Sequence, residues 1–208
     1  MSYKFLTDRK SSALVYLMLV YALKNEGFFK TLPEFGYHAD GKPYLANYPG
    51  LFFNLSHCRD AAACLLSDRE VGVDVEKVGE YDDGLARAIC NEPEYQWVTS
   101  FSDPGKRAKR VTALWTRKES LVKWLGMGLE KDPREIPSGI LSGVHHDDCH
   151  ISTRFYRSGN FYLSACSDLK KQQYHGNKKL PFIRQPERNL LRMGKRQIPD
   201  TVQSYLSL

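Results

Sequence analysis

The order of apolar segments most constrains what this 208-residue chain can fold into. A helix-like run is followed by three short strand-like runs, then by helical segments, and then by strand-like runs again. The expected helices cover residues 13–23, 83–101 and 106–125, and the expected strands cover 51–55, 61–66, 71–75, 140–144, 150–156 and 161–166. Because the same order occurs twice, we expect an α+β fold of two similar halves, residues 1–76 and 77–168, with a single mixed domain as the alternative.

The apolar run over residues 13–23 predicts a buried helix rather than a membrane span. It is too short to cross a bilayer, and the polar residues Lys24 and Glu26 follow it without a small-residue cleavage site. Thr7 or Asp8 is expected to cap this helix at its start, and Gly27 is expected to end it. The three apolar runs between residues 51 and 75 are separated by polar turns, which predicts an antiparallel meander.

The charge balance of the chain favours anionic partners. Lys and Arg number 30 against 24 Asp and Glu, which gives a net charge of +6. Residues 169–208 are basic and lack apolar periodicity, so they predict a solvated tail, with a binding arm as the alternative. The five cysteines form no CxxC pair, which fits neither a disulfide framework nor a zinc site and indicates a reducing cytoplasm.

Two carboxylates stand on one face of the expected strand Val71–Glu76. Side chains alternate along a strand, so the valines point one way while Asp74 and Glu76 project together from the other face. Neighbouring carboxylates repel unless a cation or hydrogen bonds lie between them, and oxygen ligands suit Mg²⁺. The two carboxylates are therefore compatible with a magnesium site at Asp74 and Glu76. The alternative is two exposed acids on a solvated face.

The expected helix 106–125 places a lysine in the middle of its apolar stripe. At 100° per residue, Lys118 falls between the apolar positions of the helix, and an ammonium on a packed face needs an anion. Glu119 lies on the shoulder of the same stripe, and Lys123 follows it by one turn. The alternative for Glu119 and Lys123 is a surface ion pair at i, i+4.

A strand running into a turn contains Ser56 and His57, which could hydrogen-bond a phosphate. The alternative is a structural or solvent-exposed histidine at residue 57. The sequence lacks a G-x-S-x-G elbow, a Walker loop and a G-x-G-x-x-G run, so any phosphate site uses scattered side chains rather than a glycine cradle.

These features form three motifs in one order. The motifs are Phe53-Asn54-Leu55-Ser56-His57, then Val71-Gly72-Val73-Asp74-Val75-Glu76, then Trp115-Thr116-Arg117-Lys118-Glu119-Ser120 with Lys123 and Gly126-x-Gly128-Leu129, and Gly41-Lys42-Pro43-Tyr44 precedes them. Together they resemble the Sfp-type phosphopantetheinyl transferases, and the likeness runs from about residue 8 to Ser167. The resemblance implies a pseudodimer of two α+β halves with the active site in the cleft between them. It also implies transfer of 4′-phosphopantetheine from coenzyme A to a serine of an acidic acyl or peptidyl carrier protein.

The resemblance also assigns roles to single residues. It implies that Asp74, Glu76 and Glu119 hold Mg²⁺, or Mn²⁺ in its place, and that Glu119 is the candidate base. By the same likeness, Lys118 and Lys123 are phosphate-contacting and catalytic lysines.

Coenzyme A contacts follow from the same resemblance. Ser56 and His57 would approach the 3′-phosphate of the cofactor, and Lys42 would lie near its adenosine end. The family usually opens with a strand before the first helix and has an arginine in that helix, whereas this chain has Ser11 there. We therefore expect the first half to lack an edge strand, with Arg9 as a substitute cation.

Two other functions remain open on the sequence. A catalytically weakened binding module of the same fold would recognise an acidic partner, but it has no reason to keep acids that repel polyanions. A thioester acyltransferase that uses coenzyme A would have no use for three metal carboxylates.

Overall fold

The computed structural model describes residues 2–128, 131–140 and 149–168, with the backbone alone for residues 2–13. Residues 1–177 and 178–208 form two separate units, and the fold below is that of the first. The expected strand at 140–144 and the basic tail 169–208 lie almost wholly outside the described residues. Among the described helices, none is long and apolar enough to cross a membrane.

Helices and strands follow in the expected order, helix, strands, helices, strands. The elements are α1 (Ser2–Asn25), β1 (Phe35–Tyr37), β2 (Pro43–Leu45), β3 (Phe52–Cys58), β4 (Ala61–Ser67), β5 (Val71–Lys77), α2 (Asp83–Ile89), α3 (Glu92–Thr99), α4 (Pro104–Leu125), the 3₁₀ turn Pro133–Glu135, β6 (Cys149–Tyr156) and β7 (Phe161–Asp168). The α+β class predicted from the sequence is confirmed. The short hairpin β1–β2 was not expected, because its prolines and glycines indicated an irregular crossing.

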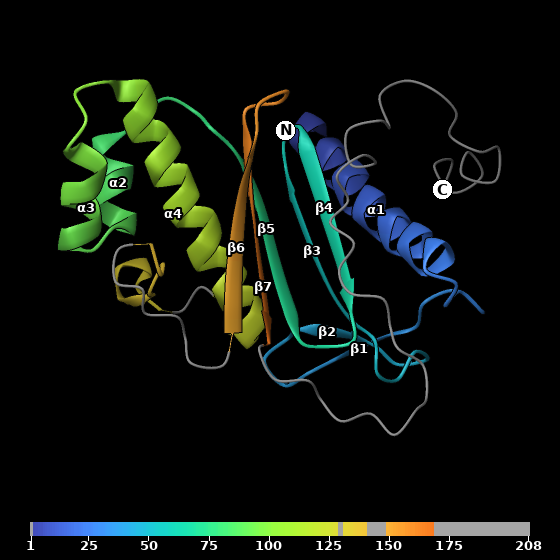
Figure 1. Cartoon of the computed structure of the whole chain (residues 1–208). Coiled ribbons are helices and arrows are strands. Elements are labelled where there is room, and N and C mark those ends of the chain that lie inside the picture. Colours follow the sequence, from blue (N-terminus) through green and yellow to red (C-terminus); the bar gives the residue numbers. More distant parts are fainter. Residues whose placement is uncertain (1, 129–130, 141–148, 169–208) are drawn as a thin grey trace. The chain divides into compact units, whose positions relative to one another are not determined.

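The strands form three antiparallel sheets, β1–β2, β3–β4 and β5–β7–β6 (Figure 1). The β3–β4 hairpin matches the first part of the expected meander, with Ser56 opposite Ala63. The third strand differs, because β5 is hydrogen-bonded to β7, with Asp74 opposite Ser164. Strand β5, which lies almost wholly within the expected first half 1–76, is therefore paired with a strand of the expected second half 77–168.

Side chains rather than a backbone ladder join β3 to β5. The backbone N–H of Val73 donates to Asn54 Oδ1 at 2.9 Å, and the N–H of Val75 donates to Ser56 Oγ at 3.3 Å. These two N–H groups lie on the edge of β5 that faces away from β7. Without the side chains of Asn54 and Ser56 they would be buried without hydrogen-bond partners. This arrangement places Ser56 directly beside Asp74.

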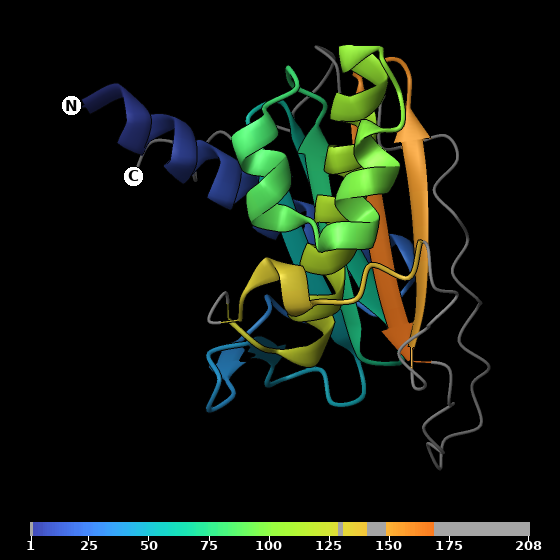
Figure 2. The same cartoon turned by 90° about the vertical axis from the view of Figure 1, so that its left-hand side faces the viewer.

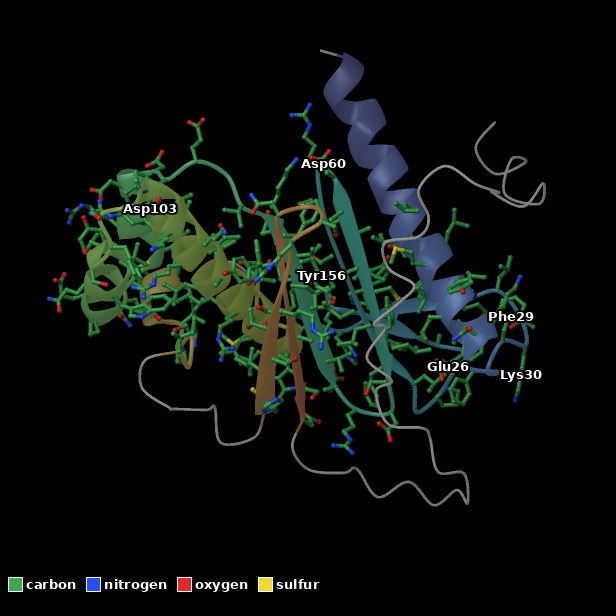
Figure 3. The ribbon with its side chains drawn as sticks, turned by 45° about the horizontal axis from the view of Figure 1, so that its top comes forward. Glu26, Phe29, Lys30, Asp60, Asp103 and Tyr156 are labelled. Atoms are coloured by element: carbon green, nitrogen blue, oxygen red, sulfur yellow. The ribbon has the colours of Figure 1, made fainter. Side chains whose placement is uncertain are left out.

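Two long helices cover the sheets (Figure 1). Leu19 and Leu23 of α1 pack with Phe53 of β3 in one core cluster, and Leu121 and Val122 of α4 pack with strands β6 and β7 in another. Figure 2 shows α2 and α3 beside α4, on the side of α4 that faces away from the sheet. The end of α1 and the cap of α4 at Asp103 stand on opposite sides of this unit (Figure 3).

Gly72 allows α4 to approach β5 closely. A Cβ atom at this position would overlap the backbone oxygen of Ser120 and the backbone nitrogen of Trp124. Since Asp74 and Glu76 share the strand face of Gly72, the absence of a side chain at residue 72 brings that face against α4.

The helix termini explain where the expected bounds were wrong. One helix was expected over 83–101, but Asn91 caps a new helix with Glu94 in a capping box, so α2 and α3 are separate. Asp103 caps α4, with Pro104 in the first turn, and Gly126 ends the helix with a φ of 72°. Helix α1 begins at Ser2, before the expected caps at Thr7 or Asp8, and Gly27 follows its end with a φ of 74°.

Candidate active site

Asp74 is the most deeply placed of the three expected carboxylates, with 4% of its side chain exposed. Its Oδ1 accepts hydrogen bonds from Ser56 Oγ at 2.8 Å and from Lys123 Nζ at 2.7 Å. Its Oδ2 is buried and has no hydrogen-bond partner among the described residues. A buried carboxylate oxygen without a donor is a costly arrangement, and it is resolved by a ligand that accepts electron pairs, such as a metal ion.

Ser56 is part of this network rather than of an open phosphate site. Its hydroxyl donates to Asp74 and accepts from Val75 N and, at 3.1 Å, from Lys123 Nζ. The hydroxyl is buried, whereas the neighbouring His57 is exposed on the opposite side of the strand. The structure thus brings Ser56 to the carboxylates and separates it from His57.

Glu76, two residues after Asp74 on β5, and Glu119, on α4, are the other two carboxylates of the cluster. Burial raises the pKa of Glu76 to about 7, and the charge of Asp74 adds to the rise, while Lys123 opposes it. Burial also raises the pKa of Glu119, again with Asp74 adding and Lys123 opposing. The three carboxylates therefore sense one another's charge, as expected for acids drawn together from a strand and a helix.

The chemistry of this cluster fits a divalent cation, although its oxygens do not converge. The described residues contain no group of three or more His, Cys, Asp or Glu side chains arranged so that it could hold a metal ion. The cluster nevertheless combines an unpartnered oxygen on Asp74 with carboxyls of raised pKa on Glu76 and Glu119. Hard oxygen ligands of this kind suit Mg²⁺, which keeps several waters and needs few protein ligands.

Lys118 lies elsewhere, in the interior between α2, α3 and α4. Its ammonium forms a buried ion pair with Glu94 at 2.6 Å and donates to the carbonyls of Ile89 at 2.8 Å and Pro133 at 2.9 Å. The prediction that Lys118 needs an anion on the packed face is confirmed. The phosphate role expected for it disagrees with this geometry, because an ammonium has three hydrogens and described groups accept all of them.

Lys42 and Arg9 were expected to contact coenzyme A. Lys42 Nζ donates to Glu70 Oε2 at 2.6 Å and to the carbonyl of Trp124 at 2.9 Å, so its charge is already paired. Arg9 lies in the first turns of α1, and its side chain is outside the described part of the structure.

Glu94, the partner of Lys118, was not predicted from the sequence. The signal for it was present, because Asn91 and Glu94 form the N-x-x-E pattern of a capping box. Glu94 accepts from the backbone N–H of Asn91 and from Lys118 with the same oxygen, Oε2. A capping glutamate that also faces a buried lysine has a second function that local sequence does not reveal.

The pKa of Glu76 predicts a pH-dependent stability of the metal-free protein. Its pKa rises from 4.5 to about 7 in the folded state, so the native state binds the proton more tightly than the unfolded state. The stability that proton binding at Glu76 contributes to the fold is fully present below pH 4.5 and is lost as the pH rises through about 7. Glu76→Gln should therefore raise the melting temperature at pH 7.5 by about 2–4 °C and leave it nearly unchanged at pH 4.5.

Differential scanning fluorimetry of the two proteins in chelator measures this difference. Added Mg²⁺ should narrow the gap at pH 7.5, because a bound cation relieves the repulsion in the wild type. Equal melting temperatures of wild type and variant at both pH values would show that Glu76 is ionised without cost in the fold.

The segment that contains these residues matches a known protein family. A model of the 4′-phosphopantetheinyl transferase superfamily matches residues 70–179, which include Asp74, Glu76, Glu119 and Lys123. The 4′-phosphopantetheinyl transferase gsp of Aneurinibacillus migulanus is 32% identical over 114 residues, which cover 55% of this chain and 45% of that protein.

Two further relatives have the same activity in their names. A 4′-phosphopantetheinyl transferase of Bacillus subtilis is 30% identical over 119 residues, covering 57% of this chain and 50% of that protein. The 4′-phosphopantetheinyl transferase AcpT of Salmonella typhi is 34% identical over 125 residues, covering 59% of this chain and 64% of that protein. The matched part of the chain thus spans about half to two thirds of the length of these relatives.

Proposed function

The chain belongs to the 4′-phosphopantetheinyl transferase superfamily, and we propose that it transfers the 4′-phosphopantetheine arm of coenzyme A to a serine of an apo acyl or peptidyl carrier protein. The observation that carries the proposal is the buried Oδ2 of Asp74, which lacks a hydrogen-bond partner among the described residues, within the cluster of Asp74, Glu76 and Glu119. This cluster lies inside the segment that matches the superfamily. It would accept a cation that in turn binds the pyrophosphate of coenzyme A.

Asp74, Glu76 and Glu119 would hold Mg²⁺, or Mn²⁺, in this proposal. When bound, the ion would neutralise the charge of the pyrophosphate and of the departing phosphate. The preference for a hard cation follows from the all-oxygen donor set of the three carboxyl groups.

The chain's own residues would handle the proton and the charge of the substrate. Glu119 is half-buried with a raised pKa, which suits a base that takes the proton of the carrier serine. The serine oxygen then forms a bond to the β-phosphorus of coenzyme A, and the bond from that phosphorus to the bridging oxygen breaks, which releases 3′,5′-ADP. Lys123, with 28% of its side chain exposed beside Asp74, would pair with a phosphate oxygen.

We propose a pseudodimer as the framework of this site. Helix α1 packs with β3 and β4 in one half, and α4 packs with β5, β7 and β6 in the other. The support is this matching order of helix and antiparallel strands, together with the location of Asp74 and Ser56 where β5 meets β3. The active-site cleft of the proposal runs between these two sets of strands.

The partner in this proposal is an acidic carrier protein. The net charge of +6 favours an anionic surface on the partner, which speeds encounter at low ionic strength. We place the reaction in the cytoplasm, where the five free cysteines stay reduced.

Incubation of the full chain with an apo carrier protein, coenzyme A and Mg²⁺, followed by intact-mass measurement of the carrier, tests the proposal. We expect the carrier mass to increase by one phosphopantetheine group, and EDTA in excess of Mg²⁺ to prevent the increase. No transfer to a panel of acyl and peptidyl carriers, combined with tight binding of an acidic carrier, would instead identify a binding module of this fold. Full transfer in EDTA would contradict the metal assignment.

A further inference from the structure

Lys42 joins three segments that are far apart in sequence. It lies on the β1–β2 hairpin, and its ammonium bridges the Glu70 carboxylate, just before β5, and the Trp124 carbonyl, at the end of α4. Only 11% of the Lys42 side chain is exposed, against 32% for Glu70. We call Lys42, Glu70 and the Trp124 carbonyl the clamp.

Other contacts support the clamp from both sides. Asp40 accepts the backbone N–H of Lys42 at 3.0 Å and lies so close to Gly126 that a Cβ there would overlap its carboxylate. The indole N–H of Trp124 donates to Asp168 Oδ1 at 2.7 Å, and the Asp168 N–H donates to the Glu70 carbonyl. The hairpin, the start of β5, the end of β7 and the end of α4 therefore meet at one point.

The clamp lies at the ends of the two elements that carry the carboxylate cluster. Glu70 precedes Asp74 by four residues along the chain, and Trp124 directly follows Lys123. The Trp124 carbonyl is one of the last carbonyls of α4, which lack partners within the helix and are stabilised by a nearby cation. Lys42 therefore restrains the end of α4 relative to the beginning of β5.

From these contacts we propose that Lys42 is a positioning residue, which sets the distance between β5 and α4 and hence the spacing of Asp74 from Glu119 and Lys123. The inference rests on the proposed transferase function, and a direct contact between Lys42 and the adenosine end of coenzyme A is the alternative that the test separates from it. The Lys42 side chain is 11% exposed and its ammonium is held by a carboxylate and a helix carbonyl, whereas the Lys123 side chain beside Asp74 is 28% exposed. The effect of Lys42 on catalysis passes through the geometry of the cluster.

A variant that tests Lys42 should remove the ammonium and keep a side chain of similar shape, because Lys42 also lines a pocket. Lys42, with Glu70, His38, Tyr44 and Phe52, lines a pocket of about 270 Å³. Lys42→Met keeps an unbranched apolar stem in that wall and removes only the ammonium. Glu70→Gln removes the other charge of the pair and keeps the shape of the side chain.

The experiment is a double-mutant cycle read by steady-state kinetics with coenzyme A varied, on the full-length chain. Lys42→Met and Glu70→Gln should each lower kcat by about tenfold while the KM for coenzyme A changes less than twofold, because small displacements of reacting groups reduce turnover. The double variant should lose no more than either single variant, since both break the same contact. Lys42→Arg should recover most of kcat, and Arg87→Met, which breaks an exposed ion pair on α2, should match the wild type.

Two patterns would overturn the inference. A tenfold rise in the KM for coenzyme A in Lys42→Met, with Glu70→Gln unchanged, would make Lys42 a direct cofactor contact. Wild-type kcat in both single variants would show that the clamp positions nothing in the reaction. A wild-type chain that transfers nothing under any condition is a separate outcome, because it contradicts the proposed function itself.

Discussion

Asp74→Asn is expected to lower kcat by about 10³-fold or more while the protein stays folded. Asparagine keeps the shape of aspartate and can still accept from Ser56 and Lys123, so the network around Oδ1 survives. The change removes the negative charge and replaces Oδ2, which has no hydrogen-bond partner in the described part of the chain, by an amide NH₂ group that cannot bind a cation. Loss of the ion pair with Lys123 and relief of repulsion from Glu76 and Glu119 oppose each other, which keeps the stability change within about 1 kcal/mol.

Kinetics with coenzyme A and an apo carrier, together with thermal unfolding of the same preparation, measure both effects. Asp60→Asn is the matched control, because Asp60 is an exposed aspartate paired with Lys77 and should retain full activity. Glu119→Gln should show the same loss as Asp74→Asn, since the proposed mechanism has the two acids hold one cation. An Asp74→Asn protein with more than a tenth of wild-type kcat would remove Asp74 from the metal site.

The titration of Glu76 and Glu119 in Asp74→Asn is a second measurement, and it does not depend on turnover. The charge of Asp74 raises the pKa of both Glu76 and Glu119. Both values should fall in Asp74→Asn when followed by carbon-detected NMR. Unchanged titration of Glu76 and Glu119 would mean that the three side chains are too far apart to share a cation.

Lys118→Met is expected to destabilise the fold by about 3–5 kcal/mol, the cost of leaving one partner of a buried ion pair alone. An apolar side chain at the centre of an apolar stripe would by itself favour the fold. Glu94 reverses that expectation, because it is 3% exposed and would keep a buried charge without a counter-ion. The carbonyls of Ile89 and Pro133 would lose their donor as well.

The matched double variant is Lys118→Met with Glu94→Gln. Glutamine is uncharged, and its carbonyl oxygen can still accept the backbone N–H of Asn91 in the capping box. We expect this double variant to regain more than half of the lost free energy of unfolding in urea titrations. Lys77→Met, which breaks an exposed ion pair, should have little effect on the same curve. Equal loss in the single and double variants would show that Lys118 acts through its carbonyl contacts rather than through Glu94.

Several features of the fold and site followed from local sequence alone. Alternation along Val71–Glu76 placed Asp74 and Glu76 on one face, because the period of a strand is two whatever it pairs with. The 3.6-residue period of α4 placed Lys118 on its buried face and so required an anion. The hairpin of β3 and β4 was also predictable, since a short polar turn leaves neighbouring strands few other partners.

Only the tertiary structure decided which distant groups meet. The pairing of β5 with β7, rather than with the adjacent β4, joins residues about ninety positions apart, and no local pattern encodes that choice. The anion of Lys118 is Glu94 from another helix, and the charge of Lys42 is taken by Glu70 and the end of α4. Periodicity within one element determines the direction of a side chain, whereas its partner depends on how elements pack, and packing minimises buried unpaired charge over the whole fold.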